Sequence, residues 1–221
     1  MTEQRNDSFP LQASAMLFDM DGTLVDSTAV VESLWRDFAA EHDLDTVELL
    51  DFSHGRQTID TLRNFLPHGP KDLALLAATL EAQELTRTQG ITQIPGAGSF
   101  IESLGQIPFA IVTSAGRALA ISRLQAAELP VPEVLITAED VLAGKPSPEG
   151  YLLAASALGV DISDCLAFED APAGLQAAVN SGAQTIVVGS HESQLTRRLT
   201  RISDYTQIRL INDALNWADI R

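Results

Sequence analysis

The segment that most constrains the fold is a short apolar run that ends in two carboxylates. Residues 15–18 read Ala-Met-Leu-Phe, and Asp19 and Asp21 follow with one residue between them. A continuous apolar run of this length is typical of a buried strand in a parallel sheet. The two-residue period of a strand points both carboxylates to one side of its carboxyl end, where open α/β sheets bind their ligands. An Asp21-Gly22 hairpin turn is the alternative, which the lack of apolar and polar alternation around it disfavours.

The two acids also predict a compensating charge. Carboxylates held side by side at the edge of an apolar core repel each other, so a cation or a shared proton must offset them. A bound divalent metal ion is the simplest compensation, because carboxylate oxygens are ligands that hard cations prefer.

Composition limits the partners and the compartment. The chain has 221 residues and a net charge of -16, which disfavours nucleic acid and anionic membrane surfaces as partners. Cys165 is the one cysteine, so no internal disulfide forms, and we find no signal peptide or apolar run of transmembrane length. We therefore expect a cytoplasmic protein that binds no membrane and is a monomer or weak homodimer.

Hydrophobic periodicity divides the chain into three parts. Residues 29 to about 89 contain helical patterns and no convincing strand, including a helix that starts at Pro70 and runs to about Thr88, and we assign residues 28–94 to this part. We expect this segment to be an all-helical insertion between a first part, residues 1–27, and a last part, residues 95–221. Candidate hinges are residues 25–29 and 93–98.

The last part alternates helical patterns with short apolar runs. This alternation predicts an α/β fold, a doubly wound parallel Rossmann-like sheet core with an inserted all-helical cap domain. The expected strands after the first one are 109–112, 134–136, 165–168, 185–188 and 207–210.

Three later segments bring polar groups to the same sheet edge. Thr113 and Ser114 follow one strand, Lys145 lies in a Gly-Lys-Pro loop, and Glu169 and Asp170 end another strand. Each has an ordinary alternative: helix capping for the hydroxyls and the acids, and a solvated loop position for the lysine. Their joint occurrence predicts one active site.

This ordered set resembles the four motifs of the haloacid dehalogenase (HAD) superfamily. The motifs are Asp19-Met-Asp-Gly-Thr23, Thr113-Ser114, Lys145-Pro146 and Glu169-Asp170, and no motif residue is missing. The helical insertion is similar to the small cap of that superfamily. Within the superfamily, residues 54–65, 143–151 and 168–174 resemble bacterial sugar-phosphate (hexose or hexitol phosphate) phosphatases. Yeast glycerol-phosphate and deoxyglucose-phosphate phosphatases look like more distant relatives.

The resemblance implies a role for each acid. Asp19 would be the nucleophile that forms an aspartyl-phosphate, and Asp21 would be the general acid and base. Mg²⁺ would bind Asp19, the backbone carbonyl of Asp21 and Asp170, with Glu169 nearby or bound through water. The implied reaction is hydrolysis of small sugar or polyol monophosphates.

The resemblance also implies a substrate site. Thr113 and Lys145 would bind the phosphoryl oxygens, with help from Ser114. In the cap, His54, Gly55 and Arg56 would contact the rest of the substrate. The alternative is that Arg56 pairs with an acid on the cap surface and that His54 is solvated. Trp35 and Phe38 lie at helical spacing with apolar neighbours, so we expect them in the cap core and not at the substrate.

Other activities share these motifs. Phosphosugar mutases (β-phosphoglucomutase-like isomerases) resemble the chain but carry a histidine where alignment from Asp19 puts Val31. Haloacid dehalogenases themselves lack the second aspartate, so Asp21 disfavours that chemistry. Glycerol phosphate and phosphoglycolate remain alternative substrates.

Overall fold

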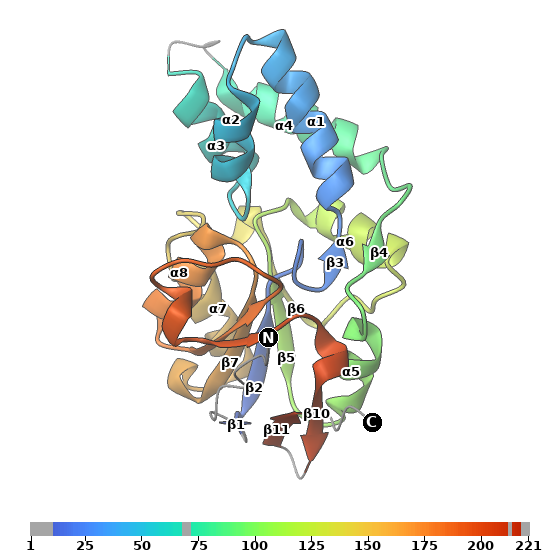
Figure 1. Cartoon of the computed structure of the whole chain (residues 1–221), viewed down its shortest axis with the longest axis vertical. Helices are drawn as coiled ribbons and strands as arrows, with labels where there is room; N and C mark the ends of the chain where they lie inside the picture. The colour runs from blue at the N-terminus through green and yellow to red at the C-terminus, as the bar shows by residue number, and fades with distance from the viewer. Residues whose placement is uncertain (1–10, 68–71, 212–213, 218–221) are drawn as a thin grey trace, which may run out of the picture.

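The computed structural model describes residues 11–67, 72–211 and 214–217. Within these residues, a sheet with helices on both faces forms one part of the molecule, and a group of helices lies over one end of it (Figure 1). We call the second part the helical group; it comprises helices α1 to α4.

The sheet is parallel throughout. Its strands in the described part of the chain, in spatial order, are β6 (Val134–Ile136), β5 (Phe109–Val112), β2 (Ala15–Phe18), β7 (Cys165–Glu169), β8 (Gln184–Val188) and β9 (Thr200–Ile202). The apolar run 15–18 forms a central strand because all four of its residues are buried. The predicted doubly wound α/β fold is confirmed.

Each face of the sheet packs on its own pair of helices. Met16 and Phe18 point into a cluster with α5 (Ala97–Ser103) and α6 (Arg117–Ala126). Ala15 and Leu17 point to the opposite face, which is covered by helices α7 (Glu149–Leu158) and α8 (Pro172–Ser181). This alternation follows from the two-residue period of a strand that is buried on both sides.

One strand prediction was wrong in its placement. The predicted run 207–210 forms β10 (Ile208–Ile211), but this strand belongs to a separate antiparallel sheet with β11 (Ala214–Trp217) and β1 (Leu11–Gln12). The outer place in the parallel sheet is taken by β9, which the sequence analysis missed. Short 3-10 helices η1 to η4 occupy residues 138–140, 162–164, 196–198 and 205–207.

The helical group has a core of its own. Its helices are α1 (Thr28–Glu41), α2 (Thr46–Ser53), α3 (Thr58–Phe65) and α4 (Leu73–Leu85). Trp35 and Phe38 are buried in this core, as predicted, with their rings 5.6 Å apart. The predicted helix start at Pro70 lies outside the described residues; α4 follows Asp72, whose carboxylate caps it, and ends at Leu85 rather than near Thr88.

The two connections to the helical group run side by side. Strand β3 (Val25–Asp26) pairs antiparallel with β4 (Thr92–Gln93). Strand β3 lies within the first predicted hinge, 25–29, and β4 overlaps the second, 93–98, only at Gln93. The chain therefore enters and leaves the helical group at one place. Among the described residues, no helix is both long enough and apolar enough to cross a bilayer.

Candidate active site

The carboxyl ends of the central strands bring the predicted core residues together. Asp19 follows β2, Glu169 ends β7, and Lys145 enters from the loop before α7. The Lys145 ammonium donates hydrogen bonds to Asp19 and, at 2.6 Å, to Oε1 of Glu169. All three side chains are buried, so this ion-pair network is largely removed from water.

One ammonium shared by two carboxylates leaves excess negative charge. Burial, followed by repulsion from Glu169, raises the pKa of Asp19 to about 7 even though Lys145 opposes the shift. Burial alone would lower the pKa of Lys145, but attraction to Asp19 and Glu169 outweighs it and raises that pKa. Burial and the charge of Glu169 also raise the pKa of Asp170. The cluster can therefore accept a further positive charge.

Glu169 uses both of its carboxylate oxygens within the protein. Besides Lys145, the Tyr151 hydroxyl donates to Oε1 at 3.2 Å. The backbone N–H groups of Asp170 and Ala171 donate to Oε2 at 2.9 and 3.1 Å. These bonds fix the carboxylate firmly, which suits a residue that positions Lys145 and its neighbours.

The donor set fits a hard divalent cation. Carboxylate oxygens of Asp19, Glu169 and Asp170 lie within 4.8 Å of one another. Asp170 approaches the backbone so closely that a Cβ on Gly22, whose φ is +83°, would lie 2.1 Å from its Oδ2. Because Glu169 is already saturated with donors, Asp19 and Asp170 are the carboxylates best suited to bind the ion directly.

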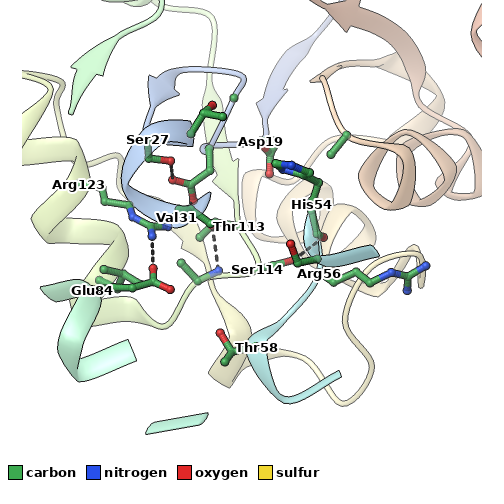
Figure 2. A pocket seen from close by; sticks show the side chains of 18 of the residues that line it. Asp19, Ser27, Val31, His54, Arg56, Thr58, Glu84, Thr113, Ser114 and Arg123 are labelled. Carbon is green, nitrogen blue, oxygen red and sulfur yellow. Dashed lines mark hydrogen bonds and ion pairs between the residues drawn. The ribbon is translucent and has the colours of Figure 1, made fainter. Parts of the chain in front are cut away.

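The side chain of Asp21 takes a different direction from that of Asp19. The Ser27 hydroxyl donates to its Oδ1 at 2.6 Å, and Arg123 donates to its Oδ2 at 2.9 Å. Arg123, on α6, also donates to Glu84 on α4 (Figure 2). Neighbouring aspartates thus have distinct surroundings, as two different chemical roles require.

The hydroxyls of the second motif have local partners. Thr113 Oγ1 accepts from the N–H of Ala115 at 3.1 Å, which is a turn-capping bond. Ser114 donates to the carbonyl of Gly55 at 2.9 Å and so joins the core to the helical group. Gly55 approaches the core closely, since a Cβ there would lie 2.8 Å from that of Ala171.

The predicted cap residues His54, Gly55 and Arg56 line a pocket that also includes Asp19. Nε2 of His54 lies 3.6 Å from Glu32, so this histidine has an acidic partner. The Arg56 guanidinium lies over the ring of Phe52, 4.4 Å from its centroid. It extends away from the side of the pocket formed by Glu84 and Arg123 (Figure 2). In this conformation Arg56 stacks on Phe52, which differs from the alternative in which it pairs with a surface acid.

Arg123 and Glu84 were not predicted as site residues, although the sequence carries a signal for each. Arg123 belongs to a buried helical stripe with Leu119 and Leu124, and Glu84 follows Leu80 at a spacing of four on the buried face of α4. A charged residue inside an apolar stripe indicates a buried ion pair.

Comparisons with known proteins agree with this site. Residues 13–182 match the family model of haloacid dehalogenase-like hydrolases. Hexitol phosphatase A of Escherichia coli is 43% identical over 183 residues, covering 81% of this chain and 85% of the relative. 2-Deoxyglucose-6-phosphate phosphatase 2 of Saccharomyces cerevisiae is 34% identical, with 79% of each chain covered.

A solved structure shares the fold. β-Phosphoglucomutase from Clostridium difficile superposes with a TM-score of 0.78 at 21% identity, covering 89% of this chain and 93% of the other. At that identity the likeness concerns the fold alone. The family model spans most of the chain, including all four motifs and the strand ends that carry them. The chain therefore belongs to the haloacid dehalogenase-like hydrolase family.

Proposed function

We propose that this enzyme hydrolyses phosphate monoesters of small sugars or polyols, with Mg²⁺ as cofactor and through an aspartyl-phosphate intermediate. The observation that carries the proposal is the pairing of a buried Asp19 beside Lys145 with a separately oriented Asp21. These different surroundings support a nucleophilic role for Asp19 and a proton-carrying role for Asp21.

The first step transfers the phosphoryl group to the protein. An Asp19 carboxylate oxygen forms a bond to phosphorus while the bond from phosphorus to the sugar oxygen breaks. The departing oxygen takes a proton from the carboxyl group of Asp21. Mg²⁺ bound to Asp19 and Asp170 would supply positive charge that lets an anionic nucleophile approach an anionic phosphate.

The second step restores the enzyme. Asp21, now a carboxylate, takes a proton from a water molecule whose oxygen attacks phosphorus, and the bond from phosphorus to Asp19 breaks. Lys145 and the Thr113 hydroxyl would bind the phosphoryl oxygens through both steps, while Glu169 keeps the Lys145 ammonium in place.

The pocket and the relatives support a polyhydroxylated substrate. Polar side chains of the helical group such as His54 and Glu81 line the pocket, and they can bond hydroxyls. The two relatives described above are named for a hexitol and a deoxyglucose phosphate. We propose that the helical group acts as a cap over such a substrate.

A mutase is less well supported. Val31 of α1 lines the pocket where the mutases carry a histidine, and α1 contains no histidine. A valine side chain cannot exchange a proton with a second sugar hydroxyl. Water is therefore the better acceptor of the phosphoryl group.

Substitution of the two aspartates tests the proposal. Asp19→Asn should keep the fold and lose at least about three powers of ten in kcat, because the amide cannot form the phosphoenzyme. Asp21→Asn should form the phosphoenzyme from p-nitrophenyl phosphate and hydrolyse it slowly, so rapid quench with labelled substrate should show labelled protein accumulating. Activity of Asp19→Asn above a tenth of wild type, or normal turnover of Asp21→Asn, would overturn the assignment.

A further inference from the structure

Three buried or partly buried charges form a row across the contact between the helical group and the core. Arg123 of α6 donates from Nη1 to Oδ2 of Asp21 at 2.9 Å and from Nη2 to Glu84 of α4. Only 4% of Arg123 and 5% of Glu84 are exposed. One guanidinium thus bridges Asp21, the proposed acid and base of the core, to a carboxylate of the helical group; Figure 2 shows the bond from Arg123 to Glu84.

Because Arg123 and Glu84 are both buried, each needs the opposite charge of the other. Burial raises the pKa of Glu84 to about 6 although the Arg123 charge opposes it, so Glu84 is costly to hold ionised without Arg123. Arg123 in turn is costly to bury without its carboxylates, because loss of one partner leaves an uncompensated charge. The position of the guanidinium therefore depends on α4 remaining packed against α6, which are in contact here.

The orientation of Asp21 depends on that guanidinium. Both oxygens of Asp21 accept hydrogen bonds, one from Ser27 and one from Arg123. Ser27 lies in the connection to the helical group, directly before α1. Arg123 is bonded to Glu84 of α4. The position of each donor therefore depends on the position of the helical group. A two-point hold fixes the plane of a carboxylate, whereas a single hydroxyl would let it rotate.

We propose that Arg123 is a positioning residue that orients Asp21 for proton transfer, and that Glu84 makes this orientation depend on docking of the helical group. The proposal rests on the function proposed above, in which Asp21 protonates the leaving group. Asp21 would then be oriented toward the leaving group of a bound substrate only when α4 is packed against α6.

Leaving groups of different basicity separate this role from a general loss of structure. Phosphoenzyme formation from sorbitol 6-phosphate requires protonation of a basic alkoxide, whereas p-nitrophenolate leaves without it. At saturating sorbitol 6-phosphate, where a change in substrate affinity does not affect the rate, Arg123→Met should slow phosphoenzyme formation about tenfold or more in rapid-quench experiments. The burst of p-nitrophenolate from p-nitrophenyl phosphate should keep a rate within about twofold of wild type.

Three further variants sharpen the test. Arg123→Lys should recover part of the lost rate. Glu84→Gln should show the same leaving-group dependence, and its effect should not add to that of Arg123→Met. Arg117→Met is the matched control, since Arg117 lies on the same helix but bonds Asp140 and the Leu135 carbonyl at the surface, and it should match wild type with both substrates.

The outcomes distinguish the two proposals. If wild type forms no phosphoenzyme on Asp19, the proposed function fails. If wild type forms it but Arg123→Met slows both substrates equally, or neither, only the positioning role is overturned. Thermal unfolding of each variant identifies one that has lost its fold, and Arg123→Lys or Glu84→Gln then decides the question by the same comparison of substrates.

Discussion

Asp19 lies in a buried site where one ammonium group forms ion pairs with two carboxylates. Lys145 bonds both Asp19 and Glu169, so the positive charge near Asp19 is divided, and burial raises the pKa of Asp19 to about 7. The pKa of Asp170 is raised in the same direction, again chiefly by burial. Near neutral pH the cluster therefore holds protons that a bound cation has to displace.

This competition predicts a pH dependence of Mg²⁺ binding. Because the metal-bound form requires ionised carboxylates, affinity should fall as the pH drops through 7, by about tenfold or more between pH 8 and pH 6. Isothermal titration calorimetry with Mg²⁺ at the two pH values measures this. Asp19→Asn, which cannot titrate at that position, should show weaker binding with a smaller change between the two. Equal wild-type affinity at both pH values would contradict the interpretation.

The residues that sequence could identify are those that follow strands. Asp19, Glu169 and Asp170 are predictable because an apolar run ends directly before them, and Lys145 because of its place in an ordered set. Arg123 was overlooked because its partners come from other elements: Asp21 is 102 residues away and Glu84 is 39 away. Long-range pairing of this kind leaves only the weak local signal of a charge within an apolar stripe.

At the scale of elements, the turn from β7 to α8 builds the acidic side of the site. Glu169 ends the strand, and its Oε2 accepts from the first N–H groups of the turn. Gly174 lies in the first turn of α8 against the same carboxylate: a Cβ there would be 1.6 Å from Oε1. The helix can approach the site only because this position has no side chain.

Gly174→Ala should therefore be destabilising despite the better helix propensity of alanine. We expect a loss of about 3 kcal/mol in the free energy of unfolding, since the clash is with a carboxylate fixed by four donors. Gly98→Ala in α5 is the matched control, because there the neighbour is the end of the flexible Gln93 side chain, and its effect should stay within about 1 kcal/mol. Urea denaturation of both variants measures the difference, and equal stabilities would refute the clash.

Elements buried on both faces were the easiest to predict. Strands β5 and β6 have the predicted bounds, and β7 and β8 are each longer by one residue. Strand β9 has the sequence Thr-Arg-Ile, in which Arg201 gives no apolar run, and it forms because β8 offers it an edge. Strand β10 has its own apolar residues, but which sheet it joins depends on β11, which pairs with it from further along the chain.

At the scale of the whole molecule, the pocket lies between two parts with separate cores. The helical group packs around Trp35 and Phe38, and the sheet packs around Phe18 and Phe168, whose rings stack 4.8 Å apart. A substrate between them would contact both. The phosphate would lie at the sheet edge and the sugar toward the helices.

This division predicts a substrate-dependent effect of Arg56. Arg56→Ala should raise KM for sorbitol 6-phosphate, a loss of about 1–3 kcal/mol in binding, with little effect on p-nitrophenyl phosphate, which has no sugar to contact the helices. Arg63→Ala is the control, because Arg63 pairs with Asp60 on the exposed face of α3. An equal loss with both substrates would mean that Arg56, stacked on Phe52, supports the helical group instead of recognising the sugar.

Because β3 and β4 pair with each other, we expect that the helical group can be removed as one segment. Asp26 and Thr92 are registered partners in an antiparallel pair, so a two-residue Asn-Gly turn could join them as a hairpin without moving either strand. A chain shortened in this way would keep the order of the parallel strands intact and uncover Arg123. Folding of this shortened chain would test the predicted boundaries of the insertion directly, because the deletion changes no side chain of the sheet.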